Sequence, residues 1–179
     1  MTSYAVFLRG VNVGGVNLKM AELRTALETL GLTDVKTLLA SGNFVAVSDA
    51  APDALKSTVE GCLRRTFGYE AWVVVLTARQ LADIIMACPY PANDPQTHSY
   101  LTLSCDPLAL DALEEAGRED TELCRLSPEA LAWLAPAGGT TDSPFSKLCA
   151  KAKYKSTTTT RNLRTLVKVR DALAQDASN

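Results

Sequence analysis

The sequence predicts an α+β protein of two ferredoxin-like, split-βαβ subdomains, each with an antiparallel sheet and helices on one face. First, apolar runs and helix-period segments follow the order β-α-β-β-α-β over residues 4–76. Second, a similar but looser order follows over the rest of the chain. Third, 179 residues with 47% hydrophobic and 21% charged residues suit a folded globular chain. We therefore expect subdomains at residues 1–77 and 78–179.

The chain begins with a strand, a loop and a helix. Residues 4–8 form a short apolar and aromatic run, which predicts a buried strand. Residues 9–17 are rich in glycine and asparagine and predict a loop. A helix follows and ends at Gly31, which supplies a left-handed stop. The apolar stripe of this helix consists of Met20, Leu23, Leu27 and Leu30.

A hairpin and a second helix come next. Residues 35–40 and 44–47 predict two strands joined by a short turn. The second helix begins at Pro52 or just after Asp53, and it ends near Gly68. The unbroken apolar run that follows, residues 71–76, predicts a strand in the interior of the sheet.

The second half predicts an incomplete repeat with a helical ending. We expect Thr77 to cap a helix. Further elements are predicted as strands over 99–104, 122–126 and 130–134 and helices over 107–117, 144–152 and 160–174. Thr159 or Thr160 would cap the last helix, which places Arg161 in its first turn. An arginine there opposes the helix dipole, so we expect it to hold an anion or an acidic side chain.

Cysteine usage and hydropathy indicate the compartment. The chain has five cysteines without a CxxC pair, which argues against a disulfide framework or a zinc site. We find no signal peptide and no apolar stretch near the ~20 residues of a membrane span. We expect a cytoplasmic protein with no membrane association, no metal and no cofactor.

The strongest local signal is the loop after the first strand. Three glycines permit a turn that presents backbone N–H groups, next to Arg9, at the start of a helix. The spacing GxxxGG matches neither the dinucleotide fingerprint nor Walker A. The alternative is a tight β-to-α connection in which Asn17 only caps the helix. The candidate anion-binding residues of this segment are Arg9, Asn12, Gly14, Gly15 and Asn17.

Two other segments supply secondary candidates. Ser41 and Asn43 form the hairpin turn, and we favour that role for them. They remain candidates because strands one and three are neighbours in a split βαβ unit. Arg161 is the candidate from the last third of the chain. Residues 140–179 contain eight Lys or Arg and three Asp or Glu, so this segment can pair with the acidic remainder or with an anion.

Four motifs resemble the bacterial family called domain of unknown function 1697. They are residues 8–15, 20–23, 41–43 and 159–162, with the sequences LRGVNVGG, MAEL, SGN and TTRN. The resemblance extends from residue 4 to about 173. It implies a pair of ferredoxin-like subdomains and no agreed activity. The residue after Asn162 is Leu163, where the family pattern has an aromatic residue.

These observations favour a protein that binds a small anionic ligand bearing phosphate or carboxylate. One alternative is an enzyme that uses the same pocket, with Arg9 and Arg161 as electrophilic groups and Ser41 as a donor. Another is a self-associating module that pairs exposed sheet faces. Sequence-specific RNA binding is disfavoured, because the third strand offers only Phe44 for stacking. The oligomeric state is left open.

Overall fold

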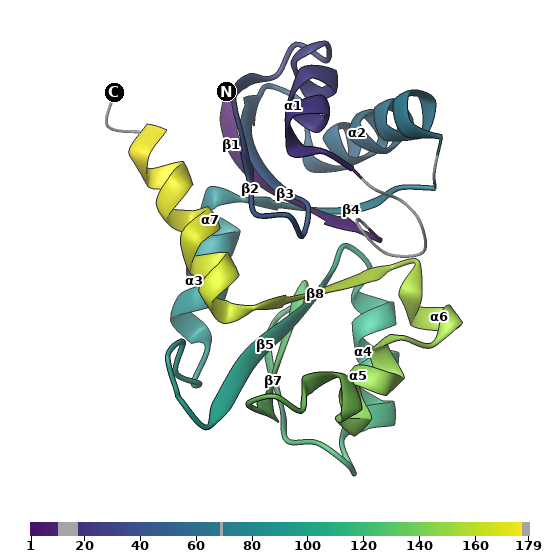
Figure 1. The fold of residues 1–179 in the computed structure, drawn as a ribbon, viewed down its shortest axis with the longest axis vertical. Helices are drawn as coiled ribbons and strands as arrows, with labels where there is room; N and C mark the ends of the chain where they lie inside the picture. The colour runs from purple at the N-terminus through teal and green to yellow at the C-terminus, as the bar shows by residue number, and fades with distance from the viewer. Residues whose placement is uncertain (11–17, 69, 177–179) are drawn as a thin grey trace. The chain divides into compact units, whose positions relative to one another are not determined.

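Two four-stranded antiparallel sheets organise residues 1–10, 18–68 and 70–176, the part of the chain that this computed structural model describes (Figure 1). The chain divides into two compact units. The N-terminal unit comprises Met1–Ala82 and the end of the chain from Lys168, and the C-terminal unit comprises Asp83–Val167. The predicted class, two ferredoxin-like subdomains of α+β type, is confirmed.

The N-terminal unit contains one sheet with the strand order β2-β3-β1-β4, and helices α1 and α2 cover one of its faces (Figure 1). This order in space, with β1 between β3 and β4, is that of a split βαβ unit. The elements are β1 (Thr2–Arg9), α1 (Met20–Glu28), β2 (Thr33–Leu38), β3 (Asn43–Ser48), α2 (Pro52–Phe67) and β4 (Trp72–Thr77).

The core of this unit follows from the strand alternation. Tyr4, Val6 and Leu8 of β1 point to the helix face, since successive strand side chains alternate between faces. Their partners from the helices are Leu23, Leu27, Leu55, Val59 and Leu63. α2 starts at Pro52 and stops at Gly68, whose φ of 67° is the left-handed C-cap that glycine adopts without steric cost.

The opposite face of the N-terminal sheet is also buried. Its side chains include Ala5, Phe7, Val45, Val74 and Leu76, all at most 4% exposed. An exposed apolar sheet face is what the self-association hypothesis requires. This face of the described sheet does not provide one.

The prediction that β4 lies in the interior of the sheet is wrong. β4 is an edge strand, and β1 is its neighbour in the sheet. Its apolar run reflects burial of side chains on both faces of the sheet. The pattern of side chains along a strand does not indicate whether that strand lies at the edge or in the middle of the sheet. The Val73 N–H donates to the carboxylate of Glu60 in α2 at 3.0 Å, which satisfies a backbone group of this edge.

The C-terminal unit contains the second sheet, with the strand order β6-β7-β5-β8. Trp133, Phe145 and Tyr154 belong to the apolar core between this sheet and its helices. The elements in chain order are β5 (Thr97–Ser104), α4 (Pro107–Gly117), β6 (Leu123–Ser127), β7 (Ala130–Pro136), η1 (Thr140–Asp142), α5 (Pro144–Cys149), α6 (Ala152–Lys155) and β8 (Thr158–Asn162).

The strand β8 corrects the predicted incomplete repeat, because it supplies the fourth strand where a helix from residue 160 was expected. Thr102 of β5 lies opposite Thr160 of β8, and their hydroxyl groups are 2.9 Å apart. The last helix, α7 (Leu163–Asp176), begins after the strand. Asn162 accepts the Arg164 N–H at 2.9 Å, so Asn162 caps this helix and the threonines do not.

One further helix, α3 (Ala78–Ala87), follows β4. Thr77 caps it as predicted: its hydroxyl accepts the Gln80 N–H at 3.2 Å, and Gln80 accepts the Thr77 N–H at 2.9 Å. None of the helices in the described ranges is both long enough and apolar enough to cross a bilayer.

Candidate functional site

β1 ends at the first predicted site residue, Arg9, which is half-buried. Gly10 then turns the chain away from the sheet with a φ of 76°, a conformation that glycine adopts readily. The candidates Asn12, Gly14, Gly15 and Asn17 lie outside the described residues. The description resumes at Leu18, two residues before α1.

The start of α1 adds a second cation. Lys19 precedes the helix in an extended conformation, and its side chain makes no capping hydrogen bond. Its ammonium nitrogen lies 3.3 Å from a carboxylate oxygen of Glu22, and both side chains are largely exposed. An exposed pair of this kind is worth little in water, so Lys19 can exchange Glu22 for another anion at small cost.

The hairpin turn between β2 and β3 lies beside the end of β1. The Leu8 N–H donates to the carbonyl of Gly42 at 2.8 Å, and Phe7 is the cross-strand partner of Asn43. Since Leu8 immediately precedes Arg9, the structure brings the Ser41–Asn43 turn next to the first candidate residue.

Asn43 has a clear structural role in this turn. Its side chain is completely buried, and its amide nitrogen donates to the Leu38 carbonyl and to the Ser41 hydroxyl, each at 2.9 Å. The turn also contains two left-handed residues, Leu39 with a φ of 59° and Gly42 with a φ of 78°. The Asn43 amide holds this conformation, which favours the turn role that the sequence indicated.

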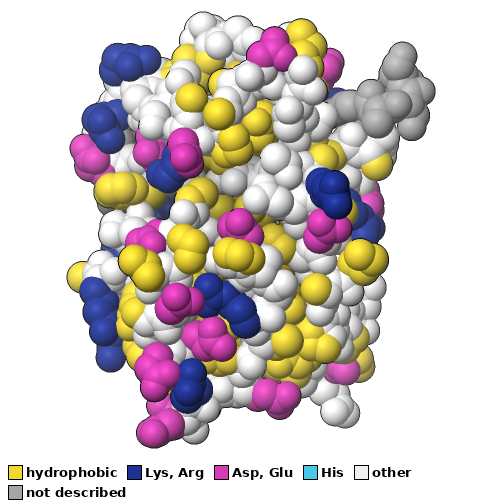
Figure 2. Space-filling view, turned by 180° about the vertical axis from the view of Figure 1, so that it is seen from behind, with side chains coloured by type: hydrophobic (Ala, Val, Ile, Leu, Met, Phe, Trp, Pro, Cys, Tyr) yellow, Lys and Arg dark blue, Asp and Glu magenta, His cyan; other side chains and the backbone are white. Residues whose placement is uncertain are grey.

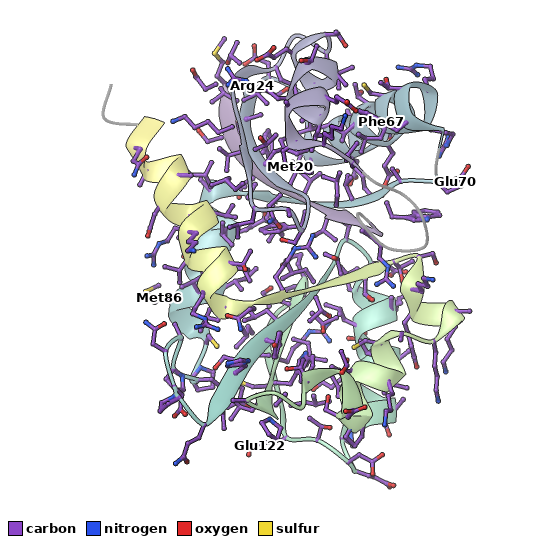
Figure 3. The ribbon with its side chains drawn as sticks, in the orientation of Figure 1. Met20, Arg24, Phe67, Glu70, Met86 and Glu122 are labelled. Atoms are coloured by element: carbon purple, nitrogen blue, oxygen red, sulfur yellow. The ribbon has the colours of Figure 1, made fainter. Side chains whose placement is uncertain are left out.

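The strand β4, the other neighbour of β1, places an aromatic side chain opposite Arg9. Arg9 is the cross-strand partner of Trp72, the first residue of β4, so both side chains leave the same face of the sheet. The indole of Trp72 is 40% exposed. Glu70, two residues earlier and labelled in Figure 3, pairs with Arg64 of α2 at 3.3 Å.

A lysine of α2 accompanies the indole. The Lys56 ammonium lies over the Trp72 ring, 5.7 Å from its centroid, which is within cation–π range. Lys56 also pairs with Glu60, one turn further along α2, and Glu60 accepts the Val73 N–H. Sequence reasoning missed Trp72 and Lys56. The signal was the antiparallel pairing of β1 with β4 in a split βαβ unit, which places the start of β4 opposite the end of β1.

Arg161 belongs to the C-terminal unit and lies in β8, not in a helical turn as predicted. Its side chain is 8% exposed. Its guanidinium donates to the Thr159 hydroxyl at 2.7 Å and to the Thr160 carbonyl at 3.0 Å. These contacts give Arg161 a role in the local structure of β8.

Two acid–base groups of the C-terminal unit have shifted pKa values. Burial raises the pKa of the Cys88 thiol above its usual range. Burial raises the pKa of Tyr90 as well, with a smaller contribution from the negative charge of Glu122. Both groups belong to the C-terminal unit, and neither was among the predicted site residues.

A hollow of about 600 Å³ lies between α1 and α2 of the N-terminal unit. It is lined by alanine and threonine side chains together with Phe67, which Figure 3 labels. The charged residue in its lining is Glu22, whose carboxylate would repel an anion. We therefore place the candidate anion site at the end of β1 and not in this hollow.

Charges of both signs are interspersed on the face of the molecule in Figure 2. The basic segment predicted over residues 140–179 includes Arg170, which pairs with the adjacent Asp171 at 2.7 Å. Mixed charge of this kind does not attract anions over a wide surface. An anion would instead be recognised locally, by side chains that converge on it.

Comparison with known proteins adds a family and a fold. The sequence model of the family described as "Protein of unknown function (DUF1697)" matches residues 1–131, which include every N-terminal site residue named above. A solved structure of a conserved bacterial protein from Streptococcus pneumoniae aligns over 96% of this chain and 98% of its own, with a TM-score of 0.77 and 24% identity. This likeness shows a shared fold.

A crystal structure of an unknown protein from Galdieria sulphuraria aligns over 97% of this chain and 90% of its own. Its TM-score is 0.26 and its identity 10%. No curated protein matches the sequence.

Proposed function

The chain belongs to the DUF1697 family of proteins of unknown function, and we propose that this member binds a small anionic ligand at the end of β1. The ligand bears a phosphate or a carboxylate group. The proposed binding residues are those that the sequence singled out in the N-terminal half, with Arg9 as the principal one.

The proposal rests chiefly on the hydrogen bond from the Leu8 N–H to the Gly42 carbonyl. This bond holds two polar segments from different parts of the sequence side by side. One is the Ser41–Asn43 turn, and the other is the point where Arg9 and Gly10 leave the sheet. Binding sites are commonly built from such loops at the end of a rigid sheet.

The chemistry of the flanking residues suits an anion. A guanidinium has a planar arrangement of donors that matches two oxygens of a phosphate or carboxylate. Arg9 is paired with Trp72 of β4, and the preceding Leu8 N–H is bonded to Gly42, so the backbone at Arg9 is positioned before a ligand arrives. Lys19, which precedes α1, adds an exposed positive charge, and the N-terminus of a helix favours anions.

We further propose that the protein works in the cytoplasm of a bacterium. None of the five cysteines, all of which lie in the described ranges, forms a disulfide, and Cys105 is exposed. Free thiols persist in reducing compartments such as the cytosol. Fractionation of the source cells, with an antibody against the chain, tests this location, and recovery from the culture medium or an oxidising compartment would contradict it.

Calorimetric titration of inorganic phosphate and of small phosphorylated and carboxylated metabolites tests the binding proposal. Charge-assisted hydrogen bonds contribute ~1.5–3 kcal/mol, so Arg9→Ala is expected to weaken binding ~10- to 100-fold. Arg118→Ala is the matched control. Arg118 is an exposed arginine of the C-terminal unit that pairs with Glu115, and its removal changes the net charge equally.

Two results would overturn the proposal. One is the absence of any binding by the wild-type chain across this set of anions. The other is equal weakening by Arg9→Ala and Arg118→Ala, because it would mean that net charge alone attracts the ligand.

A further inference from the structure

We propose that the ligand of this site also contains a planar aromatic ring, which stacks on Trp72, so that the ligand class is a nucleotide-like aromatic phosphate. The inference rests on the proposed function for its anionic group. It adds the chemistry of the rest of the ligand.

Trp72, the first residue of the edge strand β4, is a large aromatic side chain that is left partly exposed. It is 40% exposed, whereas the next three residues of β4, Val73, Val74 and Val75, are at most 5% exposed. An exposed indole presents a broad apolar face to solvent, and aromatic faces of this kind stack on planar rings. The exposure is thus specific to the first residue of the strand.

The register places this face next to the anion site. Trp72 and Arg9 are direct cross-strand partners, and such partners have Cβ atoms ~5 Å apart. Both side chains leave the same face of the sheet. One small ligand can therefore contact the guanidinium with its anionic group and the indole with its ring.

The indole is held by a defined framework. The Lys56 ammonium lies 5.7 Å from the ring centroid, and Lys56 is paired with Glu60. Glu60 in turn accepts the Val73 N–H at 3.0 Å. These linked contacts restrict the indole in the free protein. A preorganised ring loses less conformational entropy on binding.

The turn between β2 and β3 contains a second exposed apolar residue. Leu39 is 43% exposed and lies in the turn whose Gly42 bonds to Leu8. Its φ of 59° is left-handed, a conformation that costs a side-chain-bearing residue free energy. Exposed apolar groups thus occur on β4, opposite Arg9, and in the β2–β3 turn that is bonded to Leu8. This arrangement suits an organic anion better than a bare inorganic one.

Calorimetry with two matched probes tests the inference. Adenosine monophosphate has a phosphate and a ring, and ribose 5-phosphate has the same phosphate and sugar without the ring. Base stacking on an aromatic side chain predicts that the wild-type chain binds adenosine monophosphate ~10-fold more tightly or better. Trp72→Ala should abolish this preference and leave the affinity for ribose 5-phosphate unchanged, and Trp72→Phe should keep part of it.

The outcomes separate this inference from the proposed function. Equal affinity of the wild-type chain for the two probes, or equal weakening of both by Trp72→Ala, overturns the stacking inference and leaves anion binding in place. Failure of both probes and of the wider anion set to bind overturns both. Acrylamide quenching gives an independent readout, because Trp133, the other tryptophan, is 1% exposed. Bound adenosine monophosphate should protect Trp72 from the quencher, and unchanged quenching at saturation would contradict stacking.

Discussion

At the scale of single residues, two of the predicted site residues, Asn43 and Arg9, have different roles. Asn43 is completely buried and uses its amide to fix the turn between β2 and β3. Arg9 is half-buried at the strand end, where its guanidinium can contribute to recognition. Asn43 therefore acts on a ligand only through the position of the turn, whereas Arg9 acts through its own charge.

Asn43→Ala is expected to destabilise the protein by ~1–3 kcal/mol, because it removes the donor of two hydrogen bonds in a buried position. Ser41→Ala removes an acceptor for one of these bonds and should cost less. Urea unfolding followed by circular dichroism gives both free energies of unfolding. A cost for Asn43→Ala no larger than that for Ser41→Ala would contradict the structural role of Asn43.

At the scale of secondary-structure elements, two helical glycines occupy opposite environments. A Cβ built on Gly117, the last residue of α4, would lie 2.6 Å from ring carbons of Phe145. A Cβ built on Gly61, inside α2, would meet only the end of the flexible Arg65 side chain at 3.3 Å. Gly117 permits close packing of α4 against α5. Gly61 has no such packing role and lowers the stability of α2 relative to alanine.

The two glycine-to-alanine substitutions should therefore change stability in opposite directions. Gly117→Ala is expected to destabilise by ~1–3 kcal/mol through overpacking against Phe145. Gly61→Ala is expected to stabilise by ~0.5–1 kcal/mol, because alanine favours the helix. Thermal and urea unfolding of both variants provides the comparison. A stabilising Gly117→Ala would show that Phe145 moves aside freely and would refute the packing argument.

The elements also indicate what a sequence can predict. The β-α-β-β-α-β order of the N-terminal unit was predictable, because its signals are local: Pro52 starts a helix, Gly68 stops it and Thr77 caps the next one. β8 was not predictable in this way. Its threonines read equally well as helix caps, and their strand conformation depends on pairing with β5, more than fifty residues earlier in the chain.

The same distinction applies to the candidate site. Arg9 and the Ser41–Asn43 turn could be linked from the fold class, because β1 and β3 are neighbours in that topology. The fold class alone was not enough to predict the place of Trp72, because its position opposite Arg9 depends on the register between β1 and β4. Its exposure depends on packing that no local pattern records. The position of Arg161 was also predicted wrongly, because a helix was expected where β8 forms.

At the scale of the whole molecule, the chain repeats one architecture, and the candidate arginines of its two units lie in different environments. In the N-terminal unit, the end of β1 brings together an arginine, a polar turn and an exposed indole. In the C-terminal unit, the corresponding first strand is β5, which pairs with β8. Arg161 of β8 is buried, and its guanidinium donates to Thr159 and Thr160 of the same strand. We therefore expect ligand binding to depend on the N-terminal unit.

The most direct test of this account is a titration of the ¹⁵N-labelled full-length chain with inorganic phosphate and adenosine monophosphate, followed by amide and arginine side-chain NMR signals. The account predicts saturable shifts for Arg9, Gly10, Lys19 and Gly42 with both ligands, and shifts of the Trp72 indole signal with adenosine monophosphate alone. Saturable shifts confined to residues of the C-terminal unit, or no shifts in either unit, would contradict it.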